Sequence, residues 1–366
     1  MRIGYDAKRY FHNRSGLGNY SRDLVRIMCE YYPSHDYFLY TPKVPSDKLS
    51  EELTIRHPNT GFLNRLLPSY WRSKGVVRDL VQDDIDIFHG LSGEIPVGLQ
   101  QTRIKSVVTI HDLIFLRLPQ LYKPIDSVIY TRKFKYAVQH ADKIIAISQQ
   151  TKQDIVHFFH IAPEKIDVIY QGCHPAFKQE VSAEVLTKIR QKYNLPTTFI
   201  LNVGSIEPRK NAFQIVKAIE NLDIPLVVIG KDTLYSNQIK QYVTEKKMEH
   251  KVLFRKVDNM EDLAVLYKLA DIFVYPSSYE GFGIPIIEAL YSGTPVITSN
   301  TGVFPEAAGP FSYFIDPERI DQIRYAIESI LSSVDMQQEM KQNGLIYAQQ
   351  FNDDILAKKW MDVYMR

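Results

Sequence analysis

Residues 199–230 read FILNVGSIEPRKNAFQIVKAIENLDIPLVVIG, and this stretch contains the unit from which the fold is built. It opens with a short apolar run rich in β-branched residues, continues through a polar loop into an amphipathic segment of helical period, and closes with a second apolar run. A continuous apolar strand is typical of a parallel sheet that is covered on both faces. The stretch therefore predicts a strand, a helix and a second, parallel strand in succession.

The same alternation of strand and helix recurs along the whole chain. Further apolar runs are FLYTP, IDIFHG, KSVVTIHD, KIIAIS and KIDVIYQG in the first half and VLFRKV, DIFVYPS and TPVITSN in the second. Ten or more strands are more readily accommodated in two sheets of about five than in one. A chain of 366 residues also favours two domains. We therefore predict an α/β protein with two doubly wound parallel sheets.

The predicted domain boundary lies at the segment YQGCHPAF, where a strand ends in a turn that contains Gly and Pro. Trp360 and Tyr364 stand four residues apart in the last helix and need a surface that buries their rings, so we expect this helix to pack back on the first domain. By count, the first domain has a net charge of +5 and the rest −3, which favours an anionic partner for the first. The predicted segments are residues 1–175, 176–346 and 347–366.

Composition excludes several classes of protein. The net charge of +2 gives no reason to expect nucleic acid as a partner. The two cysteines, Cys29 and Cys173, form no CxxC pair, which fits a reducing compartment. The opening MRIGYDA reads as a strand, and no apolar stretch is long enough to span a bilayer. We therefore expect a cytoplasmic protein of ordinary globular composition.

The loop after the first strand of the opening stretch carries two adjacent cations. Arg209 and Lys210 lie between a strand end at Gly204 and a helix that is predicted to begin near Asn211. Cations beside the unpaired N–H groups of a helix N-terminus form a phosphate site. The alternative is a solvated charged loop with Asn211 as the N-cap. The pattern GxxxxGK[ST] of a P-loop is absent from the sequence.

Three other loops contain candidate ligand-binding residues. Gly16 and Gly18 precede a helix expected to begin near Asn19 and can cradle a diphosphate, although the alternative is a simple glycine turn. His111 and Asp112 directly follow an apolar strand, and a histidine there can bond to a sugar hydroxyl. His89 follows another strand in the same way. The alternative for these histidines is a structural role at a strand end.

The segment SSYEGFGIPIIEAL, residues 277–290, carries two acids that are eight positions apart. Eight helical residues rise about 12 Å, which exceeds the roughly 5 to 9.5 Å between the paired carboxylates of a glycosidase. Glu280 and Glu288 are therefore expected to contact different parts of one long ligand, because carboxylates accept hydrogen bonds from sugar hydroxyls. The alternative is a helix N-terminus with an acid favoured by the helix dipole and a surface glutamate beyond it.

The segment 61–80, GFLNRLLPSYWRSKGVVRDL, mixes aromatic and leucine residues with four cations. It can contact an anionic membrane surface or a lipid-diphosphate acceptor. The alternative is a helix that packs on the sheet and has a basic outer face. The sequence leaves both interpretations open.

Several of these segments resemble one family of enzymes. EGFGIPIIEAL resembles the E-x7-E motif of the family-4 retaining glycosyltransferases, and GSIEPRKN resembles their phosphate-binding Arg/Lys loop. DAKRY, RSGLGNY and TIHDLIFLRLP resemble first-domain signatures of the mannosyltransferase-like branch that builds bacterial surface polysaccharides. TSNTGVFPEAAG resembles the strand and loop that follow the motif helix. The resemblance extends in order over nearly the whole chain.

The resemblance implies a GT-B fold, with two Rossmann-like domains facing across a cleft, the donor held by the second and the acceptor by the first. It implies catalytic roles for His111, Glu280, Arg209 and Lys210. The donor-binding residues it implies are Gly16, Gly18, Arg209, Lys210, Glu280, Gly281, Phe282, Gly283, Ile284 and Glu288. Asp112 and His89 are expected on the acceptor side.

The implied reaction is retaining hexosyl transfer without a metal or another cofactor, in which the departing phosphate takes the proton of the acceptor. The implied donor is GDP-mannose first and a UDP-sugar second, and the implied acceptor is a saccharide or a lipid-linked saccharide. Peripheral contact with the inner face of the membrane would suit such an acceptor. The alternatives are a sugar-nucleotide hydrolase or epimerase and a non-catalytic sugar-nucleotide-binding protein.

Overall fold

The chain forms two compact α/β units in the computed structural model, which describes residues 1–13, 16–43, 53–58 and 68–366. Unit 1 comprises Met1–Gly172 and Asn352–Arg366, and unit 2 comprises Cys173–Phe351. The chain therefore passes between the units twice. The sequence predicts these two passages near residues 175 and 346.

Among the described residues, unit 1 has a seven-stranded parallel sheet in the order β3-β2-β1-β4-β5-β6-β7. Strand β1 lies between β2 and β4, with Tyr5 opposite Leu39 on one side and His89 on the other. The strand order therefore reverses direction between β1 and β4. The strands are β1 Arg2–Asp6, β2 Asp36–Tyr40, β3 Thr54–Arg56, β4 Ile87–Gly90, β5 Lys105–Ile110, β6 Lys143–Ala146 and β7 Ile166–Val168.

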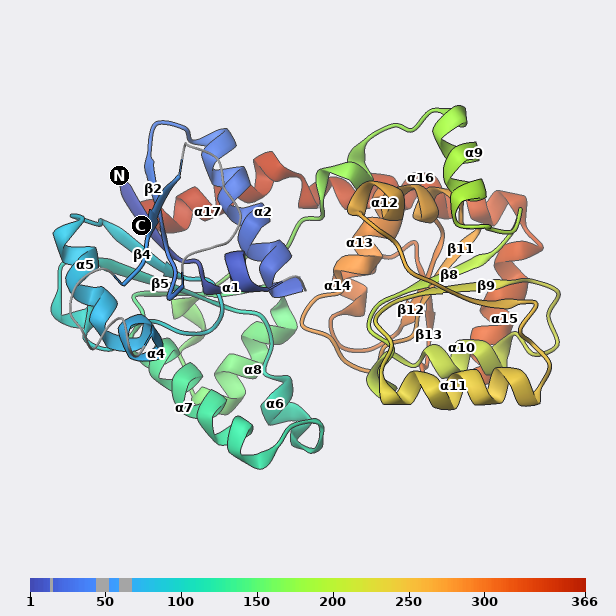
Figure 1. The fold of residues 1–366 in the computed structure, drawn as a ribbon, viewed down its shortest axis with the longest axis horizontal. Helices are drawn as coiled ribbons and strands as arrows, with labels where there is room; N and C mark the ends of the chain where they lie inside the picture. The colour runs from blue at the N-terminus through green and yellow to red at the C-terminus, as the bar shows by residue number, and fades with distance from the viewer. Residues whose placement is uncertain (14–15, 44–52, 59–67) are drawn as a thin grey trace. The chain divides into compact units, whose positions relative to one another are not determined.

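Helices cover both faces of this sheet (Figure 1). Because successive strand residues point to opposite faces, Val107 joins a core cluster with residues of α2 and α17, whereas Val108 joins a cluster with residues of α7 and α8. Trp360 and Tyr364 of α17 are almost completely buried in the first cluster. The helices are α1 Lys8–His12, α2 Gly16–Tyr31, α4 Pro68–Tyr70, α5 Val76–Gln82, α6 Ile114–Arg117, α7 Pro124–His140, α8 Gln149–Phe159 and α17 Asp353–Met365.

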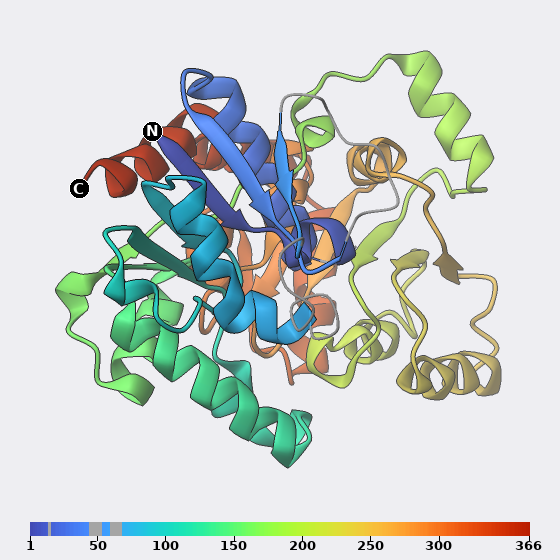
Figure 2. The same ribbon diagram turned by 60° about the vertical axis from the view of Figure 1, so that its left-hand side comes forward.

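Unit 2, which is described throughout, has a six-stranded parallel sheet in the order β10-β9-β8-β11-β12-β13. Its strands and helices are drawn from green to red in Figure 2. The strands are β8 Ile200–Val203, β9 Leu226–Ile229, β10 Val252–Arg255, β11 Ile272–Tyr275, β12 Val296–Ser299 and β13 Tyr313–Ile315. The helices are α9 Ala183–Lys192, α10 Ala212–Ala218, α11 Leu234–Glu245, α12 Met260–Leu269, α13 Ile284–Tyr291, α14 Phe304–Ala308, α15 Ile320–Leu331 and α16 Val334–Ala348.

The opening stretch of the sequence folds as the unit it predicts. β8 and β9 are parallel neighbours, with Ile200 opposite Leu226, and α10 connects them. Every residue of both strands is buried, which explains why these runs are apolar throughout instead of alternating. The prediction of an α/β fold with two parallel sheets is confirmed.

Candidate functional site

Two loops follow neighbouring strands at the carboxyl end of the unit 2 sheet. The strand order of this sheet reverses direction between β8 and β11. Such a reversal is the usual place for a ligand in a doubly wound sheet, because the connections after the two strands leave on opposite faces. Residues 204–211 follow β8 and residues 276–283 follow β11, so both predicted donor loops belong to this one position.

The backbone of Arg209 ties the two loops together. Its carbonyl oxygen accepts hydrogen bonds from the amide of Ser278 at 2.8 Å and from the hydroxyls of Ser277 at 3.2 Å and Ser278 at 3.0 Å. In the other direction, its guanidinium donates to the carbonyl oxygen of Tyr279. The loops therefore fix each other's conformation, as a site that must hold charged groups in place requires.

The carboxylate of Glu280 is the centre of the site. Its Oε1 atom lies 2.9 Å from Nη1 of Arg209 and 3.4 Å from Nζ of Lys210. The same oxygen accepts hydrogen bonds from the hydroxyls of Tyr275 at 2.8 Å and Ser277 at 3.0 Å. Burial raises the pKa of this carboxyl, but the two cations and these bonds outweigh burial and hold the pKa below its ordinary value. Glu280 is therefore ionised at neutral pH.

The two cations are also held from other sides. Lys210 donates to the Tyr275 hydroxyl at 3.1 Å, and its Nζ stands 5.4 Å from the centre of that ring. Gly204, with φ of +147°, makes room for the ammonium, since a Cβ there would lie 3.1 Å from Nζ. Burial lowers the pKa of Arg209, but the negative charge of Glu280 and the hydrogen bond to it raise the pKa by more. The pKa of Arg209 therefore lies above its ordinary value. Both predicted phosphate-binding side chains thus converge on one acid.

Glu288 lies apart from this cluster, inside α13. Its side chain is buried, and its Oε2 accepts a hydrogen bond from the hydroxyl of Tyr267 at 3.0 Å. Burial raises the pKa of Glu288 to about 7, although the bond from Tyr267 and the charge of Lys210 oppose that rise. The two predicted acids therefore have opposite electrostatic environments: one is held ionised and the other is near its midpoint at neutral pH.

The segment between these acids begins α13. Gly283 is the N-cap residue, with φ of +113°, a left-handed conformation that favours glycine, and Pro285 follows in the first turn. The ring of Phe282 is buried, 5.7 Å from that of Phe351. The amides of Phe282, Gly283 and Ile284 stand at the N-terminus of this helix, where the helix dipole favours an anionic or hydrogen-bond-accepting group.

His111 in unit 1 has both ring nitrogens engaged. Its Nε2 lies 2.9 Å from the carbonyl oxygen of Leu91, so this nitrogen carries the proton and donates. Its Nδ1 then accepts a hydrogen bond from the side-chain amide nitrogen of Gln171, Nε2, at 3.1 Å. Burial lowers the pKa of His111 to about 4, and the bond to Leu91 opposes this only in part. The ring is therefore neutral at physiological pH. Asp112 accepts a hydrogen bond from the amide of Ile114 at 3.1 Å, at the start of α6.

His89 belongs to the core of unit 1. It is fully buried, with Nδ1 2.7 Å from the Tyr364 hydroxyl and Nε2 2.9 Å from the Thr109 hydroxyl. Burial lowers its pKa to about 3. Nδ1 thus joins β4 to α17 and Nε2 joins β4 to β5, so both nitrogens serve the core of unit 1, and a role of His89 on the acceptor side stays a prediction.

The glycine loop also differs from its prediction. Helix α2 begins at Gly16 and not near Asn19, so both glycines lie in its first turn. A Cβ at Gly18 would lie 1.8 Å from the carbonyl oxygen of Asn13, whose side chain accepts from the Gly18 amide at 3.2 Å. The close approach at Gly18 is therefore to the chain's own backbone. Among the described residues outside its own helical turn, a Cβ at Gly16 would meet no atom within 4 Å.

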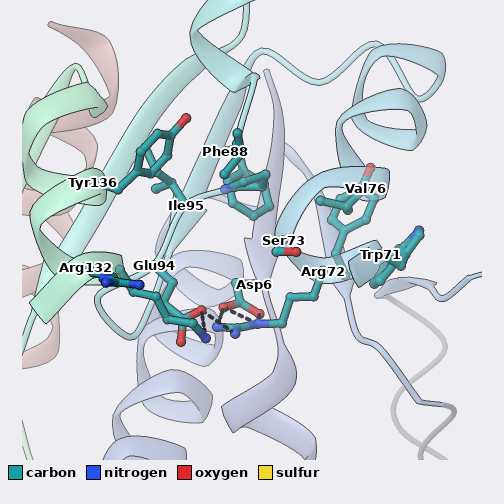
Figure 3. Close-up of a pocket in the computed structure, with 14 residues that line it drawn as sticks. Asp6, Trp71, Arg72, Ser73, Val76, Phe88, Glu94, Ile95, Arg132 and Tyr136 are labelled. Carbon is teal, nitrogen blue, oxygen red and sulfur yellow. Dashed lines mark hydrogen bonds and ion pairs between the residues drawn. The ribbon is translucent and has the colours of Figure 1, made fainter. Parts of the chain in front are cut away.

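A pocket of about 280 Å³ lies in unit 1 beside the ends of β1 and β4 (Figure 3). Its walls are mainly aromatic and aliphatic, and a charged network forms one side. Arg72 donates to Asp6 at 2.5 Å and to Glu94 at 2.8 Å, and Lys133 reaches Glu94 at 3.0 Å. The pocket thus occupies the reversal point of the unit 1 sheet, the position that corresponds to the donor loops of unit 2.

The described part of segment 61–80 forms one wall of this pocket, and residues 61–67 lie outside the described residues. Trp71, Val76 and Leu80 are buried, and Arg72 is committed to the carboxylates above. Exposed cations remain at Lys74 and Arg78. This arrangement favours the structural alternative, a helical segment packed on the sheet with a basic outer face.

Comparison with known proteins identifies the family. The model described as Glycosyltransferase Family 4 matches residues 14–177, and the model described as Glycosyl transferases group 1 matches residues 186–346. The whole chain is 30% identical to O-antigen chain mannosyltransferase B of Escherichia coli and covers 99% of that protein. The chain is a family 4 glycosyltransferase. It is also 29% identical, over 64% of its length and 62% of the relative's, to O-antigen chain mannosyltransferase RfbU of Salmonella typhimurium.

Solved structures agree on the fold of this glycosyltransferase. Alr3699/HepE of Anabaena, in complex with UDP and glucose, aligns with a TM-score of 0.76 over 100% of the enzyme and 99% of that chain, at 17% identity. At this identity the likeness shows the fold alone, which is GT-B. The predicted family, fold class and glycosyl-transfer activity are confirmed.

Two negative findings apply to the described residues of the glycosyltransferase. No three or more His, Cys, Asp or Glu side chains are grouped so that they could hold a metal ion. In the same residues, no helix has the length and apolar character needed to cross a membrane.

Three hydroxyls of the site were missed by sequence reasoning. Tyr275 bridges Lys210 and Glu280, Ser277 bonds to the same carboxylate, and Tyr267 bonds to Glu288. A signal for the first was present, because a tyrosine that ends an otherwise apolar strand places its hydroxyl at the edge of the sheet where ligands bind. Tyr267 lies within a helix and carries no such signal.

Proposed function

We propose that this enzyme transfers a mannosyl group from GDP-mannose to a saccharide or lipid-linked saccharide. The observation that carries the proposal is the convergence of Arg209 and Lys210 on one buried, ionised acid at the reversal point of the unit 2 sheet. The names of the relatives support mannose and an O-antigen type of acceptor. A UDP-sugar is the second candidate, supported by the UDP and glucose in the Anabaena structure.

In this proposal Arg209 and Lys210 bind the diphosphate and stabilise the negative charge that it gains as the glycosyl bond breaks. Glu280, held ionised by the same cations, accepts hydrogen bonds from hydroxyls of the transferred sugar. Gly281 and the amides of Phe282, Gly283 and Ile284 lie beside the sugar and phosphate. Fixed cations supply the charge that a metal ion would otherwise supply, so we propose metal-independent transfer.

Retention of configuration is proposed from the resemblance to the retaining family, whose same-face reaction needs no protein nucleophile. The departing phosphate oxygen takes the proton of the acceptor hydroxyl while the new bond forms on the same face of the sugar. Glu288 accepts from the ribose hydroxyls, and its raised pKa makes this interaction stronger as the pH rises above about 7.

The remaining roles are assigned to unit 1. We propose that His111 contacts the transferred sugar after exchanging one of its two present hydrogen bonds, and that Gly16 approaches the diphosphate. Gly18 and Asp112 hold the backbone at the starts of α2 and α6 through their hydrogen bonds with Asn13 and Ile114. The unit 1 pocket is the proposed place for the acceptor, since it combines apolar walls with a charged network.

The test compares transfer by the wild type with transfer by Glu280→Ala and Lys210→Ala, with Lys231→Ala, an exposed lysine outside the cluster, as the control. A thermal-shift screen of GDP, UDP and their sugars identifies the base, because a ligand that binds only the folded state raises Tm. We expect loss of transfer of about 10²- to 10³-fold in both site variants and none in the control. Near-normal transfer in both site variants would remove the proposed roles, and turnover without an acceptor as the main activity would favour a hydrolase.

A further inference from the structure

His111 is held by residues that follow four neighbouring strands of the unit 1 sheet. It stands directly after β5, Leu91 stands directly after β4, Thr151 lies in α8 after β6, and Gln171 comes shortly after β7. All four residues are buried. The hydroxyl of Thr151 donates to the carbonyl oxygen of His111 at 3.2 Å and so holds its main chain, whereas Leu91 and Gln171 bond to its ring.

The two partners of the ring are of opposite kinds. The carbonyl oxygen of Leu91, 2.9 Å from Nε2, can only accept a hydrogen bond, and the amide nitrogen of Gln171, 3.1 Å from Nδ1, can only donate one. Both contacts are satisfied when the proton of His111 is on Nε2. With the proton on Nδ1, one N–H would face another N–H and a lone pair would face a carbonyl oxygen. This pair of partners therefore selects one tautomer of the neutral ring.

A third contact holds the ring in place without acting on its protons. The ring of Tyr20, from α2, packs perpendicular to the imidazole with the ring centres 4.5 Å apart. Its hydroxyl is fixed in turn by the hydroxyl of Thr109 at 3.0 Å. Loss of the hydrogen bond from Gln171 therefore changes which nitrogen is protonated, while Tyr20 and Leu91 still restrain the ring.

We infer that Gln171 is a positioning residue that, by donating to Nδ1, keeps the proton of His111 on Nε2, the nitrogen that donates to an oxygen of the transferred sugar. A sugar oxygen can replace the Leu91 carbonyl at Nε2, because both are acceptors. A neutral donor suits this contact, since the transferred sugar gains positive charge as its glycosyl bond breaks. The contact with the sugar rests on the proposed function, whereas the choice of tautomer does not.

Three variants test the inference. Gln171→Met nearly keeps the length of the side chain and removes the donor, and Gln171→Glu keeps the shape and presents an acceptor to Nδ1. Thr151→Val is the matched control, because it removes a buried hydrogen bond to the main chain of His111 and leaves both ring contacts in place. Circular dichroism and Tm verify that each variant is folded.

The first measurement is nuclear magnetic resonance of the full chain with isotope-labelled histidine, in which the spectrum of His111→Asn assigns the signals of His111. At neutral pH we expect a protonated Nε2 and an unprotonated Nδ1 in the wild type and in Thr151→Val. Gln171→Met should lose this single tautomer, because nothing then selects it at Nδ1.

Gln171→Glu should put a proton on Nδ1 as well, because a carboxylate at that place favours the charged ring. The pKa of His111 should then rise from about 4, against burial and the charge of Arg9 from α1. The other titratable groups around the ring are Tyr20 of α2 and His89 of β4, which stay the same in both enzymes. An unchanged tautomer in both Gln171 variants overturns the inference.

The second measurement separates the rate from donor binding. We expect kcat of Gln171→Met to fall about tenfold, which corresponds to the loss of one hydrogen bond that orients a reacting contact. The dissociation constants of GDP and UDP should be unchanged, because the proposed diphosphate site lies in unit 2. Thr151→Val should keep the wild-type kcat, and an equal fall in this control would mean that Gln171 has only a structural role.

The variant His111→Asn distinguishes failure of the inference from failure of the proposed function. A fall of kcat in His111→Asn with wild-type kcat in Gln171→Met overturns the inference and leaves the contact of His111 with the sugar intact. Wild-type kcat in both variants, with a changed tautomer in Gln171→Met, removes the sugar contact itself and the inference with it. A fall in both, with unchanged affinity for GDP and UDP, supports the inference.

Discussion

The two units place an arginine and a carboxylate at corresponding positions, next to the strand pair where the order of each sheet reverses, but the two arginines differ in their remaining hydrogen-bonding capacity. Arg72 of unit 1 uses Nε, Nη1 and Nη2 on Asp6 and Glu94. Arg209 of unit 2 uses Nη1 on Glu280 and on the carbonyl oxygen of Tyr279, and among the described residues its Nη2 reaches the partly exposed Glu207, at 3.7 Å. One arginine is saturated by protein groups, and the other keeps donors for a ligand.

This difference separates structural from functional charge. A guanidinium with two carboxylates around it is neutralised in place and ties elements together. A guanidinium and an ammonium that share one carboxylate keep an excess of positive charge, which suits a diphosphate. We therefore expect removal of Arg72 to lower stability and removal of Arg209 to lower the rate of transfer, and the first two of four predictions test this division.

The largest effect is expected from Arg72→Met. Removing this side chain leaves Asp6 buried without its partner, which costs about 3–5 kcal/mol of unfolding free energy. Urea unfolding measures the loss, and a nucleotide titration should show donor affinity unchanged in the variant that remains folded. Unchanged stability would mean that the network does not hold unit 1 together.

Arg209→Met is expected to have the opposite profile. Glu280 keeps Lys210, Tyr275 and Ser277 as partners, so the loss of stability should be smaller than for Arg72→Met. Transfer should fall about 10²- to 10³-fold, because the leaving diphosphate loses a fixed charge. Kinetics with the preferred donor measure this. A variant that loses stability but keeps its rate once folded would contradict the division between the units.

Glu288→Gln should change the pH dependence of stability. The pKa of Glu288 is raised from 4.5 to about 7, so between these values the folded state binds a proton that the unfolded state has released. Stability from this group is therefore full near pH 4.5 and is lost as the pH rises through 7, by about 3 kcal/mol. The free energy of unfolding should differ more between pH 5 and pH 8 for the wild type than for the variant. Equal differences would show that Glu288 does not have this raised pKa.

The smallest effect is expected from Gly204→Ala. The new methyl group would stand 3.1 Å from Nζ of Lys210 at a φ of +147°, so the ammonium must shift and the backbone is strained by about 1–3 kcal/mol. Calorimetry should show several-fold weaker binding of the nucleotide diphosphate. Gly293→Ala is the control, because Gly293 also has a positive φ, of +67°, but has open space around its Cβ position. Equal affinity in both variants would show that Gly204 does not set the position of Lys210.

The fold could be predicted because the signal is repeated and local. Every apolar run named in the sequence analysis corresponds to a strand, since strands buried on both faces must be apolar throughout. The short strands β3 and β13 were not predicted, whereas β7, which also has three residues, was.

The site could be predicted only in part, for a physical reason. Arg209, Lys210 and Glu280 stand in loops that follow neighbouring parallel strands, so topology alone brings them together. His89 stands in an equivalent sequence position but is covered by Tyr364, 275 residues away, and a local pattern cannot report such a contact. Gly18 likewise serves its own loop, which a glycine pattern cannot distinguish from a ligand cradle.

The membership of α17 in unit 1 has a consequence for synthesis on the ribosome. When residue 172 leaves the exit tunnel, the sheet of unit 1 still lacks Trp360 and Tyr364, which fill its core. Unit 2 is contiguous and can complete its own core first. Residues 1–172 therefore cannot complete their core until the last helix is translated. A nascent chain arrested before residue 353 would expose to chaperones the apolar surface that α17 covers in the folded protein.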